Sequence, residues 1–334
     1  MNRADALREV SRYHDGTKHH FHRFARSFGY LDWASQPHPF RSFHGARQIA
    51  LSPQPGADRT DIGHLLRFAL GLSAWKRGRD ARWSLRVNPS SGNLHPTEAF
   101  VVTGPVTAVS EASGVYHYAT DRHCLEERCV FDAGAWSDAT TASVVALVAL
   151  TSIHWREAWK YGERAFRYCQ HDLGHAIASI RIAAALVGLR GSIAPEWSHR
   201  EIARLTGIDR DEDYVEAERE EPGCLLVLFR GDRTPAVNRI GLLDATSRGA
   251  WSGRASQLSE DHVQWTFIDD VARATEEIGA ARGVAGSTSS RQGASRVVDA
   301  NLILRRRSAL ALDGRSTIDA DDFLGMLSGV MPSN

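Results

Sequence analysis

A loop bounded by two prolines, RVNPSSGNLHPTE at residues 86–98, constrains the chain more than any other stretch. Pro89 and Pro96 fix their own backbone angles and lack an N–H, while Gly92 tolerates turns that other residues avoid. A helix is therefore not expected here, and the apolar run at 99–102 that follows predicts a strand. Three polar side chains are expected on the loop: Ser90, Ser91 and Asn93.

The chemistry of this loop suits a flavin. Its hydroxyl, amide and main-chain N–H donors match the acceptors on the ribityl phosphate or the pyrimidine edge. The Gly-x-Gly-x-x-Gly pattern of dinucleotide sites does not follow a strand here. An ordinary turn leading into a strand is the alternative, and on spacing alone such turns are the commoner case.

Apolar patterns along the chain predict both strands and helices. Strands are expected near 98–103, at 115–118, at 144–148 and at 224–229. Helical spacing is found at 60–72 and through 155–188. At 334 residues, the chain can form one large or two ordinary domains.

The composition excludes several classes of partner. Lys plus Arg and Asp plus Glu both number 40, so no net field favours nucleic acid or an anionic membrane. The longest apolar stretch, residues 144–150, is too short to span a bilayer, and no apolar signal core opens the chain. Four cysteines without a Cys-x-x-Cys pair suit a reducing compartment. We therefore expect a cytoplasmic protein that binds neither nucleic acid nor membrane.

Aromatic and basic residues alternate at 17–26, TKHHFHRFAR. Such interleaving could serve a nucleic-acid-binding arm. The zero net charge favours instead a solvated helix that packs its Phe face.

Three blocks, in order along the chain, carry a family resemblance. PSSGNLHPTE at 89–98 resembles the Pro-Ser-x-Gly-x-x-x-Pro flavin loop of the nitroreductase superfamily, particularly its SagB/ThcOx-type dehydrogenase branch. WKYGERAFRY at 159–168, continued by HDLGH at 171–175, resembles a Lys-Tyr-Gly segment of that branch. RRRS at 305–308, followed by Asp313 and Gly314, is similar to the Arg-Arg-Ser segment with which a nitroreductase module begins.

The resemblance implies an α+β, nitroreductase-like three-layer fold with a mostly antiparallel central sheet wrapped by helices. Residues 59–278 would form one FMN-binding module, preceded by an irregular extension at 1–58. A linker at 279–296, without apolar periodicity, would lead to the start of a second, incomplete module at 297–334.

The resemblance also implies an FMN site shared between two modules, hence a homodimer or a pseudo-dimer. Arg306 and Ser308 would grip the phosphate, for which a guanidinium and a hydroxyl are well suited. The other side of the cofactor would be held by Arg86, Pro89, Ser90, Ser91 and Asn93.

Lys160 and Tyr161 are the implied catalytic pair, serving as base and proton relay while hydride passes to the flavin. An alternative stays open, in which an amphipathic helix leaves Lys160 in water and buries Tyr161, Phe166 and Tyr168. His171 and His175 have the spacing of a helical metal pair, but no third ligand is evident, so no metal site is expected.

The implied function is that of an FMN-dependent oxidoreductase, a dehydrogenase acting on a heterocyclic or peptide-derived substrate. Two alternatives remain: a nitro or flavin reductase that uses NAD(P)H as reductant, and an inactive module that binds a partner in a biosynthetic assembly.

Overall fold

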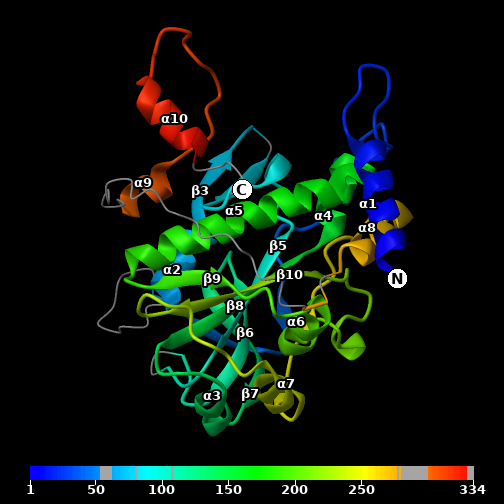
Figure 1. The fold of residues 1–334 in the computed structure, drawn as a ribbon. Helices are drawn as coiled ribbons and strands as arrows, with labels where there is room; N and C mark the ends of the chain where they lie inside the picture. The colour runs from blue at the N-terminus through cyan, green and yellow to red at the C-terminus, as the bar shows by residue number, and fades with distance from the viewer. Residues whose placement is uncertain (53–61, 80, 107–108, 277, 280–299, 329–334) are drawn as a thin grey trace. The chain divides into compact units, whose positions relative to one another are not determined.

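The chain divides into two units, residues 1–281 and 282–334, and each is described here by itself. The computed structural model describes residues 1–52, 62–79, 81–106, 109–276, 278–279 and 300–328 (Figure 1). Of the predicted linker at 279–296, only Gly279 lies within these residues.

A central antiparallel sheet forms the middle of the first unit. Its strands follow the order β11-β7-β6-β5-β8-β10-β9, and β2 pairs with β7. The bounds are β2 Arg47–Ala50, β5 Thr97–Thr103, β6 Ser113–Ala119, β7 Cys124–Phe131, β8 Val144–Ser152, β9 Arg190–Ile193, β10 Glu221–Phe229 and β11 Ala250–Trp251. Every residue of β5, β6 and β8 is buried, because helices and neighbouring strands cover the sheet on both sides.

Helical layers lie on both faces of this sheet. On one face, Leu225 and Val227 of β10 join a core cluster with apolar side chains of α3 (Ala133–Ala139), α6 (His199–Thr206) and α7 (Arg239–Ser247). Leu228 points to the other face, where the side-chain position of Gly191 is flanked by Leu228 and Arg181. Arg181 belongs to the long helix α5 (Ala165–Leu186), which runs across the strands in Figure 1. The predicted α+β, three-layer class is confirmed.

The remaining elements lie around these layers. In the first unit, helices α2 (Ile62–Ala69) and α4 (His154–Tyr161) pack against α5, and α8 (Thr266–Ala274) packs against α1 (Arg3–Thr17). Two small sheets pair β1 (Phe43–His44) with β12 (Arg254–Ala255), and β3 (Leu72–Arg77) with β4 (Arg82–Arg86). The second unit contains α9 (Ala300–Arg305) and α10 (Ala320–Ser328), and neither helix has a buried residue.

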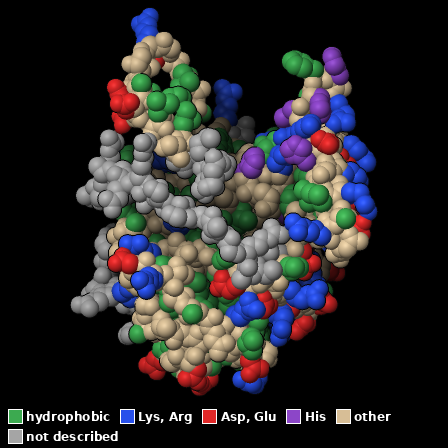
Figure 2. Space-filling model, in the orientation of Figure 1, with side chains coloured by type: hydrophobic (Ala, Val, Ile, Leu, Met, Phe, Trp, Pro, Cys, Tyr) green, Lys and Arg blue, Asp and Glu red, His purple; other side chains and the backbone are tan. Residues whose placement is uncertain are grey.

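The N-terminal segment differs from our expectation. Helix α1 (Arg3–Thr17) occupies part of the stretch that we expected to be irregular, and the helix predicted over 17–26 is wrong. Lys18 has an extended backbone, residues 19–26 form bends and irregular structure, and Phe21 and Phe24 are 96% and 72% exposed. Figure 2 shows histidine and basic side chains together beside α1, whereas acidic and basic side chains are interspersed along the lower part of this face.

Two arginines at the start of α5 and just before it contact the C-terminal residue of α1. Arg167 donates a hydrogen bond to the Thr17 hydroxyl at 3.0 Å, and Arg164 donates one to the Thr17 carbonyl. These guanidinium groups satisfy acceptors at the helix C-terminus, where such groups lack intrahelical partners. The helix boundary therefore depends on residues about 150 positions away in the sequence.

The corner between α4 and α5 is held by the N-terminal segment. Gly162 has φ +53°, and a Cβ at this position would lie 2.2 Å from the carbonyl oxygen of Arg26. The Glu163 N–H donates to the same oxygen at 3.0 Å. The close approach of the two backbones breaks the chain into two helices at this point.

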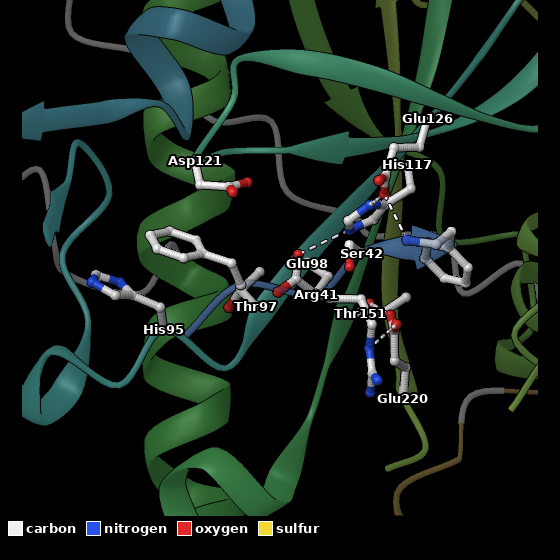
Figure 3. Close-up of polar contacts among 12 residues, drawn as sticks. Arg41, Ser42, His95, Thr97, Glu98, His117, Asp121, Glu126, Thr151 and Glu220 are labelled. Carbon is white, nitrogen blue, oxygen red and sulfur yellow. Dashed lines mark hydrogen bonds and ion pairs between the residues drawn. The ribbon is translucent and has the colours of Figure 1, made fainter. Parts of the chain in front are cut away.

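A histidine held between two glutamates joins three strands of the central sheet (Figure 3). His117 Nδ1 lies 2.9 Å from Glu126 Oε2, and His117 Nε2 lies 3.0 Å from Glu98 Oε2. The three residues belong to β6, β7 and β5 respectively, and their side chains are buried. Because each ring nitrogen faces a carboxylate, both can donate only when the ring is an imidazolium.

The cation at His117 is stabilised by its neighbours. Burial alone would lower the pKa of His117, but the hydrogen bonds and charges of Glu126 and Glu98 outweigh burial and raise the pKa to about 9. For a carboxyl group burial has the opposite effect and alone would raise the pKa of Glu98, but Arg156, His117 and Arg86 hold this pKa well below its usual range. Arg156 donates to Glu98 Oε1, which makes this carboxylate the centre of the group.

We expect His117→Gln to lower the free energy of unfolding by about 3–5 kcal/mol, because Glu98 and Glu126 would lose the buried cation between them. The pKa of His117 is higher in the folded chain, about 9, than the ordinary 6.5. Its contribution is therefore fully present below pH 6.5 and is lost as the pH rises through about 9. Urea titrations across this range should show stability falling with pH in the wild type and a flatter profile in the variant. The exposed His44 offers the control His44→Gln, and an equal loss in both variants would contradict the assignment.

At the α4–α5 corner, Gly162→Ala should lower the free energy of unfolding by more than about 1 kcal/mol, since the new Cβ meets a backbone oxygen at a positive φ. Gly174→Ala is the matched control. Gly174 lies within α5 with nothing within 4 Å of its Cβ position, so alanine should stabilise the helix by roughly 1 kcal/mol. Thermal unfolding of both variants measures the contrast; a stable Gly162→Ala protein would show that the corner can relax.

Candidate active site

The loop predicted to meet a flavin makes one short 3₁₀ turn, η2 (Ser91–Asn93). Gly92 and Asn93 both have φ near +60°, at 59° and 60°. The Asn93 amide donates to the Ser84 carbonyl at 2.9 Å, and the Ser90 hydroxyl accepts from the His95 N–H at 2.8 Å. These bonds hold the loop in one shape at the start of β5.

Tyr161 packs directly on this loop. A Cβ added to Gly92 would lie 2.6 Å from the Tyr161 hydroxyl oxygen, so only glycine fits beneath the ring. The Tyr161 ring also lies against Tyr168, with a centroid separation of 4.4 Å. Lys160 is half-buried, and its Nζ lies 5.4 Å from the centroid of the Tyr161 ring. The structure thus brings the loop and the predicted catalytic pair together.

Asp172 of α5 binds the loop, and the sequence analysis missed it. Both carboxylate oxygens lie 3.0 Å from the Ser91 N–H, and one accepts from the Ser91 hydroxyl at 3.0 Å. Burial raises the pKa of Asp172, although hydrogen bonds from Ser90 and Ser91 partly offset that rise. A signal was present, because Asp172 occupies the buried stripe of α5 otherwise formed by Cys169, Leu173, Ala176 and Ile180.

Glu157 was also missed. It is buried on α4, one turn before Tyr161, and within the described part of the chain neither carboxylate oxygen has a hydrogen-bond partner. Burial raises the pKa of Glu157 well above its usual range, and Asp172 raises it further, while Lys160 offsets only part of this. These surroundings favour a neutral carboxyl, which can donate a proton or a hydrogen bond.

Arg86, which the resemblance placed at the cofactor, is directed away from the loop surface into the protein interior. Its side chain is 3% exposed and donates to the carbonyls of Thr97 at 3.0 Å and Pro39 at 2.7 Å. Burial lowers the pKa of Arg86 to about 10, although Glu98 favours its charge. The guanidinium therefore belongs to the buried group around Glu98.

The other predicted cofactor residues are exposed. Pro89 is exposed within the loop, and Arg306 and Ser308 are exposed in the second unit. Over the described ranges, no three His, Cys, Asp or Glu side chains form a group that could hold a metal ion. Nor does any helix in those ranges have the length and apolar character needed to cross a membrane.

Comparison with known proteins matches this geometry to a family. The model of the nitroreductase family matches residues 50–217, about half of the chain, and this region contains the loop, Lys160, Tyr161 and Asp172. A protein of Methanocaldococcus jannaschii that carries the name nitroreductase is 27% identical over 135 residues, covering 39% of this chain and 64% of that protein. The trifolitoxin-processing protein TfxB of Rhizobium leguminosarum bv. trifolii is 34% identical over 111 residues, or 30% of each chain.

A solved structure supports the same conclusion. A protein of Anabaena variabilis described as a nitroreductase superposes with a TM-score of 0.55 at 26% identity, covering 66% of this chain and 46% of that one. The chain spans less than two thirds of the length of each of these three relatives. The fold, the loop and the matched region agree, and the chain belongs to the nitroreductase family.

Proposed function

We propose that this chain is an FMN-dependent oxidoreductase of the SagB/ThcOx-type dehydrogenase branch, acting on a heterocyclic or peptide-derived substrate. The contact between Gly92 and Tyr161 carries the proposal, because it brings the flavin-type loop against the Lys160–Tyr161 pair. The name of the Rhizobium relative, a trifolitoxin-processing protein, supports a processing role in a biosynthetic route. We further propose a cytoplasmic protein.

The donors on the loop fit a flavin. The Ser91 N–H and hydroxyl converge on one carboxylate, an arrangement that would also suit a single acceptor group such as a pyrimidine carbonyl. The shape of the loop depends on Pro89, Ser90 and Asn93. Arg86 would stabilise the loop through the Thr97 carbonyl without contacting the cofactor. When bound, FMN supplies the hydride acceptor that no protein side chain provides.

We assign binding of the FMN phosphate to Arg306 and Ser308. In this proposal residues 59–278 form one module, residues 1–58 precede it, and 279–296 link it to the start of a second module at 297–334. The site would be completed by a second module, in a homodimer or a pseudo-dimer.

Tyr161 is suited to hold a proton. Burial, followed by electrostatic interactions with Glu157, Tyr168 and Asp172, raises the pKa of Tyr161 to about 12, so the phenol is neutral at physiological pH. Lys160 would accept the proton that the substrate releases, and Tyr161 would pass it on or orient the substrate by a hydrogen bond.

One observation favours a second candidate, an inactive module that binds a partner in a biosynthetic assembly. Asp172 already accepts both Ser91 donors, and a flavin would have to compete with it. The flavin content of the purified chain decides between the two candidates: a colourless protein that takes up no added FMN would support the inactive module. An active reductase using NAD(P)H would bleach the bound flavin when that reductant is added.

Substitutions in the loop and in the Lys160–Tyr161 pair should have different effects, the first on flavin binding and the second on turnover. The double variant Ser91→Ala with Asn93→Ala should lose bound flavin, because it removes the Ser91 hydroxyl and the amide of Asn93 that holds the loop to Ser84. Lys160→Ala and Tyr161→Phe should keep the flavin and lose about 10²–10⁴-fold in turnover, the usual cost of a positioned proton-transfer group. Flavin absorbance per chain and steady-state turnover measure the two effects. Lys76→Ala and Tyr116→Phe serve as matched controls, and wild-type turnover in the Lys160 and Tyr161 variants would contradict their assigned roles.

We expect Glu157 to lower the stability of the folded chain and to support turnover. Because its folded-state pKa is raised, Glu157 disfavours the folded chain increasingly as the pH rises above its ordinary 4.5. Glu157→Gln should therefore raise the free energy of unfolding at neutral pH and lower turnover, as expected for a group kept for function. Unfolding curves at pH 4 and pH 7, with turnover at pH 7, measure both effects. A variant that gains stability and keeps full turnover would show that Glu157 takes no part in the reaction.

A further inference from the structure

A cavity of about 350 Å³ lies between the N-terminal segment, α4 and the stretch at 261–263. This volume falls in the range of small-molecule pockets, roughly 300–1,000 Å³. Four aromatic side chains and two carboxylates are prominent in its lining: Phe28, Tyr30, Trp155, Trp159, Asp32 and Asp261.

The two tryptophans contribute ring surface to this cavity, because their N–H groups are already bonded. Trp155 Nε1 donates to the Ser259 hydroxyl at 2.8 Å. Trp159 Nε1 donates to the Asp32 carbonyl and to the Ser35 hydroxyl, both at 3.2 Å. The ring of Phe28 packs edge to face against that of Trp155, with the two centroids 6.3 Å apart. The face of an aromatic ring carries partial negative charge and attracts cations.

The carboxylates add formal negative charge. Asp32 Oδ1 accepts from the Ala34 N–H at 3.0 Å, which fixes this side chain at the start of η1 (Trp33–Ser35). Within the described residues, the one hydrogen bond found at Asp261 goes to its main-chain carbonyl, which leaves the carboxylate to the cavity. The imidazole of His262 also lines the cavity, with its ring centroid 6.1 Å from that of Trp155, but neither lysine nor arginine does. A neutral apolar ligand would cover these carboxylates without compensating their loss of water, and an anion would be repelled.

The cavity is separate from the candidate active site. Trp155 and Trp159 are four residues apart and share one face of α4. Glu157 and Tyr161 share the opposite face, which turns toward the loop. A ligand on the tryptophan side would therefore not compete with a cofactor at the loop.

We propose that this cavity binds an organic cation, an ammonium or guanidinium group carried on a compact apolar stem. The ring faces and the two carboxylates would together replace the water lost by the cation. The same chemistry is found in a free quaternary ammonium compound and in an arginine side chain of a peptide. The inference does not depend on the proposed flavin chemistry.

Calorimetric titration of the full chain tests the proposal with two cations, choline and Nα-acetyl-arginine amide. Their controls are the uncharged tert-butyl analogue of choline and Nα-acetyl-citrulline amide. At least one cation should bind about tenfold or more tightly than its neutral analogue. Preference for choline would identify a free cation as the ligand, and preference for the arginine amide would identify a peptide side chain.

Two variants at exposed positions link binding to the cavity. Tyr30→Ala, at a residue 79% exposed, and Asp261→Asn should each weaken binding about fivefold to thirtyfold while leaving the fold intact. Glu260→Gln and Phe21→Ala, which alter exposed side chains outside the cavity, should bind as the wild type does. Failure of both cations to bind, equal binding of the neutral analogues, or wild-type affinity in Tyr30→Ala and Asp261→Asn would each overturn the proposal.

Discussion

The buried charges centred on Glu98 connect the core of the sheet to the candidate active site. Glu98 is the second residue of β5 and lies three residues after His95 of the loop. Arg156 of α4 donates to Glu98 and also to the His95 carbonyl at 2.8 Å. One guanidinium therefore ties the end of the loop to the helix that carries Lys160 and Tyr161. Because unpaired buried charges are strongly unfavourable, the strands, the loop and α4 must assemble together.

A second buried pair repeats this design on the neighbouring strands. Arg41 Nε lies 3.5 Å from Glu220 Oε1, and the same carboxylate accepts from Thr151 at 2.5 Å (Figure 3). Thr151 belongs to β8, whereas Arg41 comes from the N-terminal segment. Segments remote in sequence are thus joined to the sheet by specific polar contacts as well as by apolar packing. Such contacts can favour one arrangement over others with similar apolar burial.

Local patterns in the sequence were sufficient for single strands, helices and the loop, whereas the three-layer arrangement followed from the family resemblance. Apolar runs predicted the strand at 144–148 and helical spacing predicted 155–188, since burial imposes the period of each element. Prolines and a glycine marked the loop for the same kind of reason. The end of α1 depends on contacts with Arg164 and Arg167, and the partner of Asp172, Ser91, lies 81 positions away, although the place of Asp172 in the buried stripe of α5 was a local signal. Contacts over such separations leave no local pattern in a single sequence.

The contact of Gly162 with Arg26 makes the N-terminal segment part of the site's architecture. It holds the end of α4 in place, and the same stretch of chain supplies one wall of the aromatic cavity. Removal of the first thirty residues would therefore affect two regions on opposite faces of one helix. Insertions or fusions near residue 26 would displace the end of α4, more than a hundred positions downstream. A change in chain length at this end would reshape the corner between α4 and α5 and one wall of the aromatic cavity, while leaving the central sheet intact.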